Sequence, residues 1–278
     1  MEQEEWNHKV LLGILWSSFA RYYFFMTSAN WGLWHHKLLI DELLRFPIVL
    51  AKENPISEKI IAIVDRLRNY HPQKHDLLYS DGVVEAEIEI QRRIWEKELD
   101  EAVFELYGLN EEQKDLIRDC CEVTLPFFYK PFNSVGTMSA VQDNDLSWIE
   151  KYVYIFARRW NTYLGGAAEM RAEVHVGAHG NMVAVEFFTA DKIDPWNLNI
   201  KNDSWQYVLE QIGKALPQPM ETSQILVDGV VHVVSDDAII VIKRNEKRFW
   251  TRSLAREDAD ATLCKRMVES GSEDGGQD

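Results

Sequence analysis

The chain has 278 residues, of which 46% are hydrophobic and 27% are charged, so it can bury a core and is not broadly disordered. Its formal net charge of −15 argues against a general nucleic-acid coat protein, because phosphate binding depends on clustered Lys and Arg, although a local basic patch is compatible with this charge. There are three cysteines, and Cys120 and Cys121 are adjacent, which does not make a disulfide framework. This cysteine usage is typical of a reducing cytosol, and we expect a cytoplasmic protein.

The most apolar stretch, residues 10–26, contains Arg21 and two serines. Because a membrane span needs about 20 predominantly apolar residues, we interpret this stretch as a buried amphipathic helix and expect no membrane association. The acidic start, residues 1–5, is unlike a secretory or mitochondrial leader. Apolar residues recur at helical spacing within this helix, namely Leu12, Leu15, Trp16, Phe19, Tyr23 and Met26.

The next segments also favour helices. Residues 28–32 break the first helix, and a short helix is predicted over residues 38–44. An apolar stripe at residues 60–67 is followed by a long predicted helix over residues 83–107. Gly108 is expected to end that helix, and Asn110 to cap the following one.

Residues 131–145 are rich in Ser, Gly, Asn and Thr, and we interpret them as a linker between domains. The fold class we predict is α+β, with a mostly helical N-terminal block, residues 6–130, followed by a smaller α+β domain with antiparallel hairpins, residues 146–268. Residues 269–278 are acidic and rich in Gly, and we expect a disordered tail.

Alternating apolar patterns predict the strands of this second domain, and Asp-Gly at 228–229 is a strong hairpin signal. The predicted strands are 170–176, 182–189, 225–227, 230–235, 238–243 and 249–253, and the predicted helices are 146–163, 204–216 and 255–268.

His175 and His179 flank the turn of the first hairpin at four-residue spacing. No third ligand is evident in the sequence, so we interpret both as surface residues of the turn and expect no metal ion. The sequence also contains no phosphate loop, nucleophile elbow or zinc-protease motif, and we expect no cofactor and no catalytic residue.

Two groups of residues are candidates for binding nucleic acid. The first is an aromatic and basic loop between the first two helices, where Trp, His and Lys side chains are suited to stacking on bases; the alternative is that Trp31 and Trp34 fill gaps in the core. The second is a late basic cluster suited to phosphate contact; the alternative is that its members pair with the acidic helices of the first block. The candidates are Asn30, Trp31, Trp34, His35, His36 and Lys37 in the loop, and Lys243, Arg244, Lys247, Arg248 and Arg252 in the cluster.

Two stretches of the helical block, residues 11–48 and residues 99–117, follow a pattern known from one enzyme family. The second stretch reads LDEAVFELYGLNEEQKDLI. The first stretch carries the match through Ser17, Tyr22, Tyr23, Ser28, Trp31, Gly32, Leu43, Pro47 and Ile48. Together the two stretches cover residues 11–128 and resemble the C-terminal, target-recognition and following helical region of adenine-N6 DNA methyltransferases of restriction–modification and phage-defence systems.

The chain lacks the catalytic Asn/Asp-Pro-Pro-Tyr/Phe loop and the glycine-rich methyl-donor site of that family. The resemblance therefore implies a non-catalytic DNA-specificity or accessory piece, with duplex DNA and a catalytic methyltransferase chain as partners. An alternative is a protein-interaction or regulatory subunit without nucleic-acid contact, which the net charge favours. A third is a truncated gene product with an exposed apolar helix.

Overall fold

The chain forms two compact units, Met1–Cys121 and Glu122–Asp278. The division falls before residues 131–145, the segment in which we expected it. The structure is a computed structural model that describes residues 3–29, 38–50, 53–70, 81–142, 145–166, 168–177, 179–191, 197–201, 204–215, 231–235 and 238–274.

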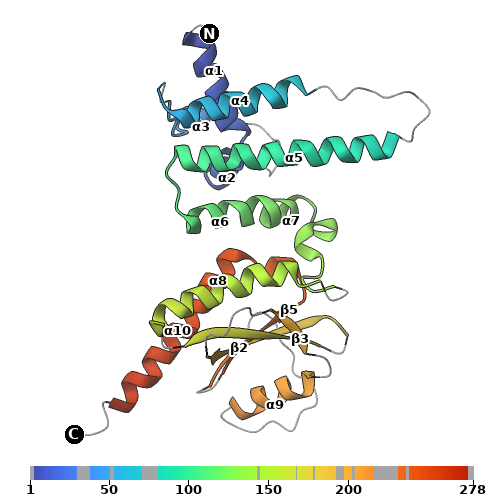
Figure 1. The fold of residues 1–278 in the computed structure, drawn as a ribbon, viewed down its shortest axis with the longest axis vertical. Helices are drawn as coiled ribbons and strands as arrows, with labels where there is room; N and C mark the ends of the chain where they lie inside the picture. Colours follow the sequence, from blue (N-terminus) through green and yellow to red (C-terminus); the bar gives the residue numbers. More distant parts are fainter. Residues whose placement is uncertain are drawn as a thin grey trace. The chain divides into compact units, whose positions relative to one another are not determined.

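The first unit is helical, and within the described residues no helix has both the length and the apolar character needed to cross a membrane. Its long helices α4 and α5 run side by side (Figure 1). The helices of this unit are α1 (Gln3–Trp16), α2 (Ser18–Thr27), α3 (Ile40–Leu44), α4 (Pro55–Asn69), α5 (Asp81–Leu106) and α6 (Glu111–Asp119).

The single helix expected over residues 10–26 is divided at Ser17. The Ser17 hydroxyl donates to the Ile14 carbonyl at 2.6 Å and caps α2 by accepting from the Ala20 N–H, so it competes with the helical backbone. The break turns Trp16 and Met26 outward, with 43% and 61% of their surfaces exposed. The apolar core instead contains Trp6, Val10, Ile14, Ala20 and Phe24 from α1 and α2, with Ile60, Ile61, Ile63 and Val64 from α4.

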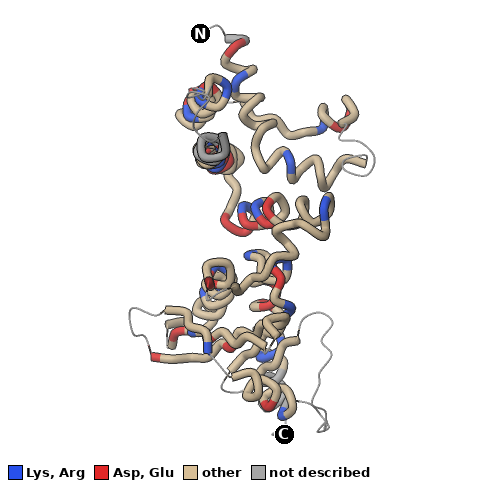
Figure 2. Tube along the Cα trace, turned by 90° about the vertical axis from the view of Figure 1, so that its right-hand side faces the viewer, with Lys and Arg blue, Asp and Glu red and all other residues tan. Residues whose placement is uncertain are grey.

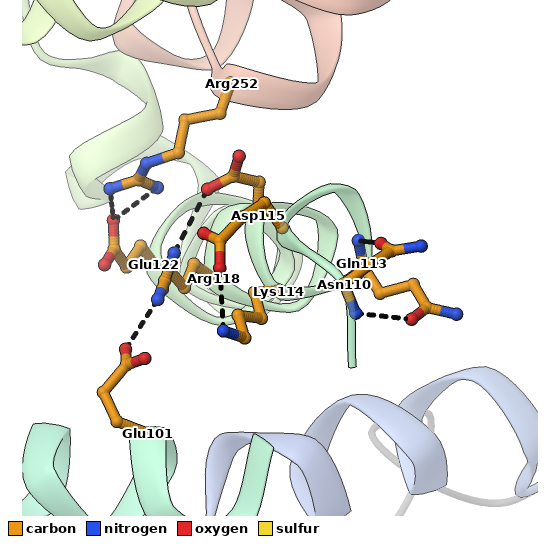
Figure 3. A network of polar contacts seen from close by, with 9 residues as sticks. Glu101, Asn110, Gln113, Lys114, Asp115, Arg118, Glu122 and Arg252 are labelled. Atoms are coloured by element: carbon orange, nitrogen blue, oxygen red, sulfur yellow. Dashed lines mark hydrogen bonds and ion pairs between the residues drawn. The ribbon is translucent and has the colours of Figure 1, made fainter. Parts of the chain in front are cut away.

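The junction between α5 and α6 has the expected local chemistry. Gly108 has a φ of +64°, the left-handed conformation that glycine adopts most easily. Asn110 caps α6 by accepting from the Gln113 N–H at 2.9 Å, and the Gln113 side chain accepts from the Asn110 N–H at 3.0 Å (Figure 3). The prediction of a glycine stop followed by an asparagine cap is confirmed.

The second unit begins with short helical segments that fold onto its core. Residues 131–145, expected as a linker, contain two 3-10 turns, and Ala140 and Val141 are buried in the core cluster. The amide of Asn245 holds this segment, because it donates to the Val141 carbonyl and accepts from the Val141 N–H, both at 2.9 Å. The expectation of a free linker was wrong because turn-forming residues also suit a packed, irregular segment. The segments are η1 (Cys120–Thr124, which spans the unit boundary), α7 (Leu125–Tyr129), η2 (Pro131–Asn133) and η3 (Val135–Thr137).

A five-stranded sheet in the order β3-β1-β2-β5-β4 forms the centre of the second unit. The predicted hairpin of β1 and β2 is confirmed, with Glu173 opposite Glu186. β3 pairs parallel to β1, so the sheet is mixed rather than built from antiparallel hairpins alone. The strands are β1 (Glu169–Val176), β2 (Met182–Ala190), β3 (Asn199–Lys201), β4 (Val231–Val234) and β5 (Ala238–Arg244).

Helices cover both faces of this sheet in the second unit (Figure 1). On one face α8 (Ser147–Leu164) and α10 (Arg252–Asp274) pack over a core that includes Phe156 and Phe187, whose stacked rings are 3.8 Å apart. On the other face α9 (Trp205–Ala215) buries Val208 and Ile212 against β4 and β5. The α+β class is therefore confirmed.

Two predictions near the C-terminus were wrong. Residues 249–253 do not form a strand: a 3-10 turn, Lys247–Phe249 (η4), precedes buried Trp250, whose indole N–H donates to the Arg244 carbonyl at 2.9 Å. The following helix α10 extends to Asp274, into the tail expected to be disordered. The strand expected over residues 225–227 lies outside the described residues.

Candidate nucleic-acid interface

Lys243, the first residue of the predicted basic cluster, is not on the surface. It lies on β5 facing α10, its side chain is fully buried, and it forms an ion pair with Asp258. Its ammonium also donates to the Phe249 carbonyl at 3.0 Å. The expectation that Lys243 contacts phosphate is corrected, because strand alternation turns it into the core.

Arg252 is also paired within the second unit. Both of its terminal nitrogens donate to Glu122, at 3.2 and 3.3 Å (Figure 3), and its side chain is only 15% exposed. Its partner, Glu122, is an acid within residues 6–130 and belongs to the same unit as Arg252, so the pairing with an acid agrees with the alternative interpretation of the cluster. The Arg252 guanidinium therefore points at the Glu122 carboxylate and not at solvent.

Arg244 and Arg248 are brought together at one cavity of about 700 Å³ in the second unit. Arg244 comes from the end of β5, and Arg248 from the turn η4. Phe132, which is 92% exposed, lies at the same cavity. The remaining lining residues are Phe127, Pro131, Thr137, Ser139, Gly180, Asn181, Met182, Asn245 and Glu246.

Aromatic rings fix the position of the basic groups near this cavity. The Arg248 guanidinium lies 4.6 Å from the ring centroids of Phe127 and Phe249, and its Nε donates to Glu246 at 2.7 Å. The Lys247 ammonium lies 5.1 Å from the Trp148 ring, whose indole N–H donates to the Lys247 carbonyl. Such contacts hold a cation in place while leaving it charged.

Along both units, basic and acidic residues are interspersed in the chain (Figure 2). Within the described residues, the fold brings two basic side chains, Arg244 and Arg248, to one cavity, which Glu246 also lines. The sequence predicted these two arginines but not the aromatic and amide groups beside them. Of those groups, Phe132 belongs to the segment that we interpreted as a linker.

The first predicted group, the loop from Asn30 to Lys37, lies outside the described residues.

Several aliphatic side chains of the first unit face solvent on and near α3. Ile40 and Leu44 are each 76% exposed. The others are Leu39, Leu43, Ile48 and Leu50.

The structure corrects our interpretation of His175 as a surface residue of a turn. His175 is fully buried on β1, and its ring contacts Ser204 and Glu186. Glu173 lies on the same face of β1, which gives a His and two carboxylates with ligand atoms within 4.8 Å of one another. The sequence contained a signal for this group, because alternation along β1 and the hairpin register place Glu173, His175 and Glu186 on one face of the sheet.

No protein-family model matches the chain, and no curated protein or solved structure matches it either.

Proposed function

We propose that this chain is a non-catalytic DNA-contacting accessory subunit of an adenine-N6 DNA methyltransferase system. The observation that carries the proposal is the cavity at which Arg244, Arg248 and the exposed ring of Phe132 meet. The methyltransferase system comes from the resemblance of residues 11–128, and the partner is a catalytic methyltransferase chain. The three free cysteines support a cytoplasmic location for such a complex.

The chemistry of the cavity supports contact with a nucleic acid. Guanidinium groups donate paired hydrogen bonds to phosphate or to the edge of guanine. An exposed phenyl ring offers a face for base stacking, and the Asn181 amide and Ser139 hydroxyl supply further hydrogen-bonding groups. Because only a few cations take part, we expect weak binding that is completed by the partner chain.

The test is a titration of a labelled DNA duplex with the full chain, alone and with a catalytic methyltransferase chain, at salt concentrations from about 50 to 200 mM. We expect binding to weaken as salt rises and to be lost in Arg244→Glu and Arg248→Glu. Arg158→Glu, at an exposed position of α8, makes the same charge change elsewhere in the second unit and is expected to bind like the wild type. Binding unchanged by the first two variants would reject the proposal.

The exposed aliphatic side chains of α3 favour a second candidate, a protein-interaction subunit without DNA contact. Apolar side chains gathered on a surface commonly mark a protein interface. Ile40→Glu and Leu44→Glu are then expected to abolish co-purification with the methyltransferase chain. If this interface alone defines the function, the duplex titration shows no binding in either arm.

A further inference from the structure

A group of polar side chains lies between the β1–β2 hairpin and the start of α9. His175 is fully buried, the Glu186 side chain is 10% exposed, and the Glu173 side chain is 33% exposed. The His175 Nε2 is 3.1 Å from Glu186 Oε2, and the His175 Nδ1 is 2.6 Å from Ser204 Oγ. The group is therefore closed on the His175 side and open to solvent at Glu173.

Hydrogen-bond directions determine which imidazole nitrogen carries a proton. Ser204 Oγ lies 2.7 Å from the Lys201 carbonyl oxygen, which only accepts, so the hydroxyl hydrogen points to that carbonyl. Ser204 Oγ must then accept from His175 Nδ1–H. In the neutral imidazole this leaves the lone pair of Nε2 directed at the Glu186 carboxylate, which is also an acceptor.

The His175 Nε2 lone pair and the Glu186 carboxylate are two acceptors only 3.1 Å apart. This approach requires a cation between them or a second proton on the ring. The surroundings favour an added cation, because Glu173 and Glu186 are directly opposite each other in the hairpin, where like charges are unfavourable. The other oxygen of Glu186 accepts from the Tyr207 hydroxyl at 2.6 Å, which fixes the carboxylate. Carboxylates and imidazoles that bind metals are commonly held by such outer hydrogen bonds.

We propose that His175, Glu186 and Glu173 bind one divalent transition-metal ion, for which Zn²⁺ is the suitable probe. The inference is independent of the proposed DNA contact. An imidazole nitrogen and carboxylate oxygens are donor atoms that Zn²⁺ binds, and solvent would complete the coordination at the open side. Bond lengths of about 2.1 Å place neighbouring ligand atoms about 3.0 to 3.4 Å apart, which agrees with the distance between His175 and Glu186.

Lys201 is the competitor for this ion. Its ammonium donates to Glu173 Oε2 at 2.5 Å, and its side chain is 56% exposed, so it can turn into solvent when an ion binds Glu173. Removing the ammonium should therefore strengthen metal binding. A merely structural role for the three ligands does not predict this effect.

The test is a calorimetric titration of the EDTA-treated full chain with Zn²⁺, together with its thermal unfolding with and without Zn²⁺. We expect one ion per chain and a rise in Tm, because the ion binds the folded state. Glu173→Gln, at the half-exposed ligand, should weaken binding at least about tenfold without loss of the fold. Lys201→Ala should lower the Kd, and Glu210→Gln, at an exposed acid of α9, is the control that should leave the Kd unchanged.

Three results would overturn the proposal. The wild-type chain shows no Zn²⁺ binding, Glu173→Gln binds as tightly as the wild type, or Lys201→Ala binds more weakly. The first result would mean that the three side chains only stabilise the fold of the hairpin. The other two would place the ion elsewhere in the chain.

Discussion

Lys243 of β5 and Asp258 of α10 form an ion pair in the interior of the second unit. Asp258 also accepts from His232 at 2.9 Å and from the Tyr152 hydroxyl at 2.5 Å. Burial raises the pKa of Asp258, but the hydrogen bond from His232 and the charge of Lys243 outweigh this, so the pKa lies below its ordinary value. The buried lysine is thus compensated by one carboxylate that is held by three donors.

Loss of Asp258 should leave the buried ammonium without its counter-charge. We expect Asp258→Ala to lower the free energy of unfolding by about 3–5 kcal/mol in urea denaturation. Combining it with Lys243→Met should recover part of this loss, because the unpaired charge is removed. Asp260 lies on the same helix as Asp258, and Asp260→Ala, which breaks its exposed pair with Arg159 of α8, should cost about 1 kcal/mol or less. Equal losses for Asp258→Ala and Asp260→Ala would contradict this account.

Asn245 should be sensitive to a nearly isosteric change. Its amide nitrogen donates to the carbonyls of Val141 and Gly180, at 2.9 and 2.8 Å, and its oxygen accepts from the Val141 N–H. Asn245→Asp keeps the acceptor but directs a carboxylate oxygen at two carbonyls. We expect it to destabilise the fold by at least as much as Asn245→Ala, about 1–3 kcal/mol. A neutral effect of Asn245→Asp on thermal unfolding would show that the amide orientation is reversed.

Features determined by neighbouring residues could be predicted from the sequence. The glycine stop at Gly108 and the cap at Asn110 depend only on local backbone chemistry, and the alternation of residues 170–189 is sufficient for the β1–β2 hairpin. Ser17 shows the limit of periodicity, because its capping side chain divides a stretch with continuous apolar spacing.

The candidate site was harder to predict because it depends on distant partners. Charge in the sequence does not reveal that Lys243 points at Asp258 on a helix, or that Arg252 meets Glu122. His175 was misinterpreted because its contact with Ser204 requires α9 to fold over the hairpin. Among the predicted residues that the structure describes, Arg244 and Arg248 share a cavity.

Asp100 should give the first unit a pH-dependent stability. It accepts from the Ser18 N–H at 2.7 Å, and burial raises its pKa to about 6 from an ordinary value of 3.8. Between these values the folded state holds a proton that the unfolded state has lost, so the free energy of unfolding decreases as pH rises from about 4 to 6. Two pKa units correspond to at most ~3 kcal/mol, less because the residue is only partly buried.

Asp100→Asn removes this titration and should flatten the pH profile of stability over the same range. The measurement is a series of urea unfolding curves at pH values from about 4 to 7 for the wild type and the variant. The difference between their free energies of unfolding is then plotted against pH. Glu105→Gln, an exposed substitution on the same helix, controls for the loss of one charge. A difference between wild type and Asp100→Asn that does not change with pH would show that Asp100 is ionised throughout.

Substitution by alanine at two helical glycines should change the free energy of unfolding in opposite directions. At Gly13 of α1, an added Cβ would lie 2.4 Å from Ile60 Cγ2 and 3.0 Å from Val64 Cγ2, both in the packed core. Overpacking costs about 1–3 kcal/mol, which exceeds the gain in helix propensity of up to ~1 kcal/mol, so Gly13→Ala should destabilise the first unit.

Gly213 of α9 is the matched case, because an added Cβ there meets nothing within 4 Å. The substitution there changes only the helix propensity, which is higher for alanine than for glycine. Gly213→Ala should therefore raise the free energy of unfolding by up to ~1 kcal/mol. Urea unfolding of both variants measures the two effects in the same chain. If Gly13→Ala were stabilising as well, α1 could not pack against α4 as closely as the Gly13–Ile60 approach requires.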